Sequence, residues 1–180
     1  MRLTSSDKPS ENTMNSIEIN ITEEMTQRAH KKALTVGEIK NSFLKGKGNF
    51  HGFLGEEMVI SLFPNLKRKD SKDFDLILDT EYPPLKIEVK TKRRNVPPKD
   101  EYTCHVSATS KHQDPDVYMF CQVTTEEPYK GYVLGWLPKE VFYKVSDHRK
   151  KGQIDKYGFA EKADGFVCKI SDLMHPIDFL

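Results

Sequence analysis

The amino-acid sequence predicts an α/β domain in which helices precede a meander of strands. Its 180 residues are about the length of one domain. Helical patterns come first, and short runs of β-branched and aromatic residues between proline-rich turns follow them. The apolar run Val117–Val123 is the best candidate for a central strand buried on both faces. Helices, then strands, then mixed elements are typical of an α/β arrangement.

The first part of the chain contains a leader and two predicted helices. Residues 1–21 are rich in Ser, Asn and Thr without periodicity, so we expect a flexible leader before a single domain over residues 22–180. Acidic and then basic residues predict a helix over about 22–40. After a loop of glycines and lysines, a second helix is predicted over about 53–63, where Pro64 ends it.

The strands are predicted from alternating apolar residues between turns. Proline pairs after Tyr82 and Val96 mark two of these turns. Residues 137–180 form a C-terminal extension, which the sequence leaves open as part of the core or as a specificity element. In chain order, the predicted strands are 75–78, 85–91, Thr103–Ser107, Val117–Val123, 132–136 and 166–170, and a short helix is predicted at 139–144.

Composition excludes several classes of protein. The apolar runs are far shorter than a membrane span, and no basic-then-apolar leader begins the chain, so we expect a cytoplasmic protein with no membrane partner. Three cysteines without CxxC spacing favour neither a disulfide framework nor a zinc site. The six histidines show no metal-ligand spacing. The sequence lacks the GxSxG nucleophile elbow that is typical of serine hydrolases.

The distribution of charge indicates an anionic partner. The net charge is only +1, but residues 40–99 hold 13 basic and 8 acidic side chains, a local excess of +5. Such an excess is typical of surfaces that bind nucleic acid. A solvated basic face is the alternative interpretation.

The densest chemical signal lies on the first two predicted strands. Side chains alternate along a strand, so Glu88 and Lys90 share one face. If the two strands pair, Asp75 lies beside Glu88. Two adjacent carboxylates repel each other, and a hard divalent cation such as Mg²⁺ relieves that repulsion. Such an ion acidifies a bound water beside a phosphodiester, and Lys90 is suited to orient that water. These residues therefore suit metal-assisted phosphodiester hydrolysis.

The acid-x-Lys pattern is not specific by itself. The first occurrence lies in a predicted helix, where such residues do not share a face, and the second lies in a polar turn. Only the third stands in a strand with an aspartate upstream, and its alternative interpretation is an edge strand with a surface ion pair. The three occurrences are Glu38/Lys40, Asp70/Lys72 and Glu88/Lys90.

A further candidate acid lies on the second predicted helix. On a helical wheel Glu56 has apolar side chains on both sides, whereas Glu57 lies in the widest apolar gap and is expected to be solvated. A carboxylate within an apolar arc usually has a partner or a task. The alternative is a half-exposed glutamate in the first helical turn, stabilised by the helix dipole.

These residues together resemble the PD-(D/E)xK, or restriction-endonuclease-like, nucleases. The resemblance rests on Gly55-Glu56 at a helix start, Asp75 opening a strand and Glu88-Val89-Lys90 thirteen residues further on, and it spans about residues 43–135. Phe74 replaces the proline of the family pattern. The resemblance implies a central mixed sheet of about four strands flanked by helices. It also implies Mg²⁺-dependent cleavage of DNA, with Mn²⁺ able to substitute.

The resemblance assigns roles residue by residue. Asp75 and Glu88 would ligate the metal, with the backbone carbonyl of Val89 as a further ligand. Lys90 would position the attacking water. Glu56 would match the helix acid that binds or orients the metal in many members.

Basic residues flank the predicted acids. Lys45 and Lys47 precede the acid-bearing helix, and Lys92, Arg93 and Arg94 directly follow the acid-bearing strand. We expect them to contact the phosphates of a nucleic acid, which gives salt-dependent affinity with little sequence preference. Ordinary surface charges are the alternative interpretation.

The sequence therefore predicts a Mg²⁺-dependent DNA endonuclease acting in recombination, a mobile element or defence. Cutting both strands of a duplex would favour a homodimer. Two alternatives stay open: a non-catalytic nucleic-acid-binding module with the same fold, and a nuclease that acts on RNA. The sequence also leaves open whether Asp73 or Asp75 is the metal ligand, because a shift of register would exchange them.

Overall fold

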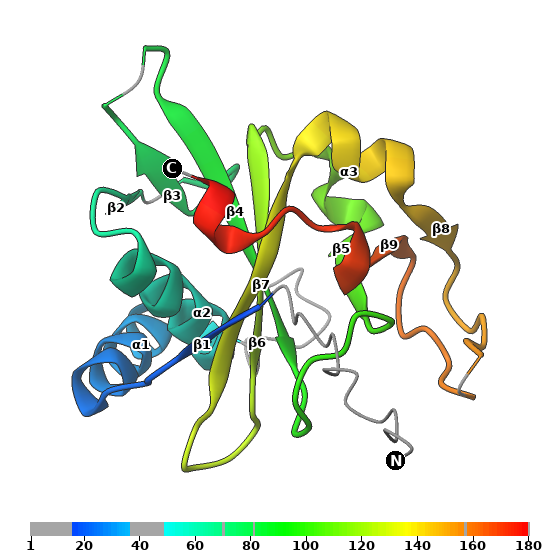
Figure 1. The fold of residues 1–180 in the computed structure, drawn as a ribbon, viewed down its shortest axis with the longest axis horizontal. Coiled ribbons are helices and arrows are strands. Elements are labelled where there is room, and N and C mark those ends of the chain that lie inside the picture. Colours follow the sequence, from blue (N-terminus) through cyan, green and yellow to red (C-terminus); the bar gives the residue numbers. More distant parts are fainter. Residues whose placement is uncertain (1–15, 37–48, 70, 81, 157, 180) are drawn as a thin grey trace, which may run out of the picture.

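The computed structural model describes residues 16–36, 49–69, 71–80, 82–156 and 158–179, and it has the predicted α/β class (Figure 1). In chain order its helices and strands are β1 (Ile17–Ile19), α1 (Glu23–Val36), α2 (Asn49–Leu62), β2 (Lys67–Arg68), β3 (Leu76–Leu78), β4 (Leu85–Arg93), β5 (Thr103–Ser107), the 3₁₀ helix η1 (Ala108–His112), β6 (Val117–Val123), β7 (Gly131–Pro138), α3 (Lys139–Val145), β8 (Asp147–Arg149), β9 (Gly165–Lys169), and the 3₁₀ helices η2 (Ile170–Asp172) and η3 (Pro176–Phe179).

The larger sheet has six strands in the order β1-β7-β6-β4-β3-β2. It is mixed, because β4 and β6 are parallel while every other neighbouring pair is antiparallel. The predicted central strand is confirmed: every residue of β6 is buried, as its continuous apolar run indicates. The expected sheet of about four strands is extended at its two edges by the short strands β1 and β2.

Both faces of this sheet are covered. Helix α2 packs on β4, β6 and β7, and α1 packs on α2 (Figure 1). A second sheet, in the order β5-β9-β8, and helix α3 cover the opposite face. Separate apolar clusters fill the two sides, one around Leu54 and Met58 and the other around Tyr118 and Phe142. No helix in the described part of the chain has the length and apolar run that a bilayer crossing needs.

Strand β4 divides its side chains between these two clusters. Ile87 and Val89 point into the cluster below α2. Glu88 and Lys90 therefore leave the other face, where Glu88 is level with Tyr118 of β6. The crossover from β4 to β6 contains β5 and η1, so this connection returns over the face that carries the two charged residues.

Two local predictions differ from the structure, and a third is confirmed over the residues described. The end of the predicted leader forms β1, which pairs with β7 at the sheet edge, because Ile17 and Ile19 supply a short alternating pattern. Helix α2 begins at Asn49 instead of about residue 53, so Gly55 and Glu56 lie within the helix and not at its start. The helix expected over about 22–40 is confirmed as far as Val36, and the rest of that span lies outside the described residues.

The C-terminal extension belongs to the packed structure. Helix α3 packs on β6 and β7, and β9 pairs with β5. Phe142, Cys168 and Ile170 of this extension are buried in the same cluster as Tyr118. The extension therefore completes the cover of the sheet face on which Glu88 and Lys90 lie.

Candidate active site

Strands β3 and β4 bring Asp75 beside Glu88. The antiparallel register pairs Leu76 with Ile87, and Asp75 directly precedes Leu76, so its carboxylate lies near that of Glu88. The Asp75 backbone N–H donates to the Ile87 carbonyl at 3.0 Å, and its carboxylate Oδ2 accepts from the Val89 N–H at 2.9 Å. These bonds fix both the backbone and the side chain of Asp75. Asp73 is exposed, so the structure distinguishes the two aspartates and places Asp75 next to Glu88.

Lys90 completes a charged cluster on this face. Its Nζ donates to Glu88 Oε1 at 2.7 Å and to Gln113 Oε1 at 3.3 Å. Glu88 is only 6% exposed, and the Lys90 side chain is 19% exposed. The predicted trio of Asp75, Glu88 and Lys90 is thus brought together by pairing and alternation. The ammonium remains within reach of solvent, while the carboxylate beside it does not.

The electrostatics of this cluster are those of an undercompensated acid pair. Burial and the neighbouring Asp75 carboxylate raise the pKa of Glu88 to about 7, although Lys90 opposes the shift. Burial also raises the pKa of Asp75, against the opposing effects of the Val89 N–H and Lys90. The charges of Lys90 and Lys32 therefore do not fully offset the two carboxylates, and the pair would hold a further positive charge.

Gln113 is the site residue that sequence reasoning missed. It follows η1 and lies 23 positions after Lys90, with no motif to mark it. Its Oε1 accepts from Lys90, its Nε2 donates to the Lys72 carbonyl at 3.1 Å, and its own carbonyl accepts from Lys139 Nζ. Gln113 thereby ties Lys90 to the turn before Asp75 and to the start of α3.

Glu56 and Glu57 lie in a separate ion-pair network. Arg68 of β2 bonds both carboxylates, Lys32 lies 3.6 Å from Glu56, and Arg28 donates to Glu57 at 2.7 Å. The expectation that Glu57 is solvated is wrong, because it is only 7% exposed. Its wheel position faces α1 and β2, whose contributions to burial the isolated helix pattern does not contain.

The close packing of α2 on β4 depends on Gly55. A Cβ atom at Gly55 would overlap the Thr91 hydroxyl, and the Gly55 carbonyl lies 3.9 Å from Cys121 Sγ. Only glycine lets the helix backbone approach the strand this closely. This packing sets the helix that bears Glu56 and Glu57 directly on the strand that bears Glu88 and Lys90.

The predicted phosphate-contacting residues are divided by the alternation of β4. Arg93 is exposed. Lys92 instead donates to the Thr103 carbonyl at 3.2 Å, and burial lowers its pKa. The Arg94 guanidinium lies 4.1 Å from the centre of the Tyr102 ring. Lys45 and Lys47 lie outside the residues that the structure describes.

The carboxylates of Asp75 and Glu88 are the candidate ligands for a divalent cation at this cluster. The buried Glu88 and the partly buried Asp75, both with raised pKa values, offer the oxygen ligands that Mg²⁺ prefers, and Mg²⁺ commonly takes only one or two carboxylates and keeps several waters. Asp75 and Glu88 therefore fit the ion. Within the described ranges, no third Asp, Glu, His or Cys joins them in a group that could hold a metal. Glu56 is thus not placed as a third ligand.

Comparison of the chain with protein-family models, with curated proteins and with solved structures finds no match. The functional assignment therefore rests on the residues and geometry of the cluster around Glu88.

Proposed function

We propose that this chain is a Mg²⁺-dependent endonuclease that hydrolyses phosphodiester bonds in DNA and is built on a restriction-endonuclease-like core. The observation that carries the proposal is the undercompensated pair of Asp75 and Glu88 with Lys90 at its rim. Like charges that are removed from solvent destabilise the folded state, so a purely structural role does not account for this pair. The order of the elements supports the same interpretation. Helix α2 precedes β3 and β4, and the acids Asp75 and Glu88 lie where the family pattern has its metal ligands.

The residues have distinct roles in the proposed reaction. Asp75 and Glu88 would hold Mg²⁺, which polarises a phosphoryl oxygen and lowers the pKa of a bound water. Lys90 orients the attacking water through its ammonium and stabilises negative charge on the phosphoryl group. Gln113 holds the Lys90 side chain against rotation through the bond at 3.3 Å. Mn²⁺ would replace Mg²⁺ at this oxygen site.

The partner that fits this chemistry is DNA, in recombination, a mobile element or defence. The exposed Arg93 would contact phosphates of the DNA. Such contacts give an affinity that falls as the salt concentration rises. A homodimer would supply the second centre that cutting both strands requires.

One observation favours a second candidate function. Only two carboxylates gather at the cluster, since no third metal-ligating side chain joins them among the described residues. A domain that binds nucleic acid without cutting it would need no complete metal site. In that case Lys90 and Arg93 would serve as phosphate contacts only.

Cleavage of supercoiled plasmid separates the two candidates. Native protein is incubated with Mg²⁺ or with EDTA beside the Lys90→Ala variant. We expect nicked or linear plasmid only with Mg²⁺, and a loss of at least about a hundredfold in rate on substitution, the usual effect of removing one transition-state contact. Absence of cleavage on plasmid, branched DNA and RNA, with binding retained, would establish the non-catalytic module.

A further inference from the structure

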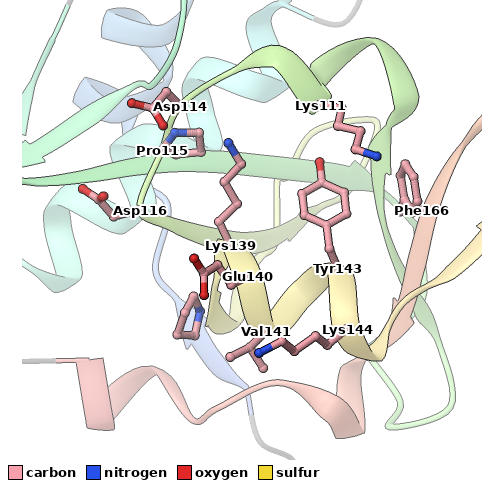
Figure 2. A pocket seen from close by; sticks show the side chains of 11 residues that line it. Lys111, Asp114, Pro115, Asp116, Lys139, Glu140, Val141, Tyr143, Lys144 and Phe166 are labelled. Carbon is pink, nitrogen blue, oxygen red and sulfur yellow. The ribbon is translucent and has the colours of Figure 1, made fainter.

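A groove of about 800 Å³ lies beside the candidate active site (Figure 2). Its walls come from η1 and the segment after it, from α3, and from β9. Acidic side chains, Asp114, Asp116 and Glu140, lie around Lys139 at one end of the view (Figure 2). Lys111, Tyr143 and Phe166 lie together at the other end. The two ends thus differ in chemistry.

Aromatic rings form the floor of the second end. The Tyr143 and Phe166 rings meet edge-on with centroids 5.0 Å apart, and the exposed His148 ring lies at 31° to Phe166 with the same spacing. Tyr143 and Phe166 are only partly buried, although they adjoin the core cluster around Phe142. Partly exposed rings at the edge of a groove are the platforms on which nucleic-acid bases stack.

Lys111 places a positive charge over these rings. Its Nζ lies 5.7 Å from the Phe166 centroid and 6.0 Å from the Tyr143 centroid. No carboxylate in the described part of the chain forms an ion pair with it. At the other end, Lys86 bonds Asp114 through Nζ at 2.7 Å and Asp116 through its backbone N–H at 2.8 Å, and Glu140 is exposed. The end with the rings is therefore the end that attracts an anion.

Gln113 joins the groove to the active site. It lies two residues after Lys111, accepts from Lys90 through its side chain, and accepts from Lys139 through its carbonyl. Lys111 and Asp114, on either side of Gln113, both line the groove, so the groove begins one residue from the group that holds Lys90. The groove is thus a direct extension of the site of the proposed hydrolysis.

We infer that this groove binds an unpaired stretch of the DNA substrate, with a base stacked on Phe166 and the adjoining phosphate at Lys111. The bases of an intact duplex stack on one another and cannot reach a ring platform, whereas an unpaired base can. The substrate class is then DNA with a single-stranded segment, such as a branch, flap or gap. This inference rests on the proposed nuclease function and narrows its substrate.

Binding measured without metal tests the groove independently of cleavage. Fluorescence anisotropy in EDTA compares a labelled oligothymidine of twelve nucleotides, an abasic strand of the same length, and a blunt duplex. The variants are Phe166→Leu, which keeps apolar volume but removes the ring, and Lys111→Gln. Lys31→Gln, on the exposed side of α1, is the matched control. Thermal unfolding verifies that each variant folds.

The expected pattern separates stacking from charge. The native protein binds oligothymidine more tightly than the duplex. Phe166→Leu weakens oligothymidine binding about tenfold, the scale of one lost base–aromatic stack, and leaves the abasic strand unchanged. Lys111→Gln weakens both strands, and Lys31→Gln weakens neither. Equal affinity of native protein, Phe166→Leu and Lys111→Gln for oligothymidine, or tighter binding of the duplex, would overturn the inference.

Plasmid cleavage with Mg²⁺ is measured in parallel. Cleavage together with unchanged oligothymidine binding in the groove variants removes the inference and leaves the nuclease proposal standing. Ring-dependent binding without cleavage of any nucleic acid removes the nuclease proposal, and the groove then remains as a single-strand binding site.

Discussion

Two pairs of acidic side chains, one on α2 and one on β4 and the residue before β3, differ in how their charge is balanced. Glu56 and Glu57 on α2 are contacted by three cationic side chains, Arg68, Lys32 and Arg28. Lys90 forms a hydrogen bond with Glu88 alone, and Asp75 feels the charges of Lys90 and of Lys32 without a hydrogen-bonded cation of its own. Burial is similar for the three glutamates, which are between 4% and 7% exposed. Direct bonds to cationic side chains, not the degree of burial, distinguish the pairs.

This difference indicates which pair is structural. A buried acid with hydrogen-bonded cations around it holds α1, α2 and β2 together and has no capacity for another positive charge. An acid pair with raised pKa values is incompletely neutralised, so a further positive charge would stabilise it. Charge balance therefore explains Glu57 by the packing of α2 and supports the proposal that Glu88 belongs to a cation site. It also weakens the role that the family resemblance implies for Glu56.

The largest effect is expected from breaking the balanced pair. Arg68→Ala removes the cation that contacts both Glu56 and Glu57 and leaves two buried carboxylates poorly compensated. We expect the free energy of unfolding to fall by about 3–5 kcal/mol, measured by denaturant titration. Arg28→Ala is the matched control, because its side chain is 59% exposed and should cost about 1 kcal/mol or less. Equal losses for both variants would contradict the assignment.

The pair of Asp75 and Glu88 is expected to make the free energy of unfolding depend on pH. The pKa of Glu88 rises on folding from its ordinary value of 4.5 to about 7. The folded state then binds a proton that the unfolded state has lost, so this contribution to stability is full below about pH 4.5 and is lost as the pH rises to about 7. In EDTA we expect a loss of roughly 3 kcal/mol across this range. Glu88→Gln should remove that slope, and an unchanged slope would refute the coupling.

The smallest predicted effect concerns the residue that holds Lys90. Gln113→Ala removes the acceptor of the 3.3 Å bond without touching either carboxylate. We expect kcat for DNA cleavage to fall about tenfold with little change in KM, since one neutral-to-charged hydrogen bond contributes about that much. Gln113→Glu keeps an oxygen for Lys90 and should recover most of the rate. A loss in KM alone would place Gln113 in substrate binding instead.

The charged trio was predictable because its signal is local. Alternation along 85–91 places Glu88 and Lys90 on one face, and the short turn after 75–78 makes antiparallel pairing of the two strands the simplest topology. The buried central strand was predictable for the same reason, from its continuous apolar run. The class of the fold followed from the order of these elements.

Other parts of the site depend on contacts between distant segments. Gln113 reaches Lys90 only because the crossover through β5 and η1 returns over β4. Glu57 is buried by α1 and β2, which the wheel of α2 does not contain. The strands β1 and β2 contain three and two residues, too few for a periodic pattern to mark them.

Metal titration of the folded protein tests the contrast between the two acid pairs most directly. Isothermal calorimetry at pH 8 follows the binding of Mn²⁺ and Mg²⁺ to the native protein and to two variants, Glu88→Gln and Glu57→Gln. The two variants are matched, because each replaces a buried glutamate with glutamine. We expect about one ion per chain for the native protein and for Glu57→Gln, and no saturable binding for Glu88→Gln. Retained binding in Glu88→Gln, or its loss in folded Glu57→Gln, would contradict the assignment of the cation site.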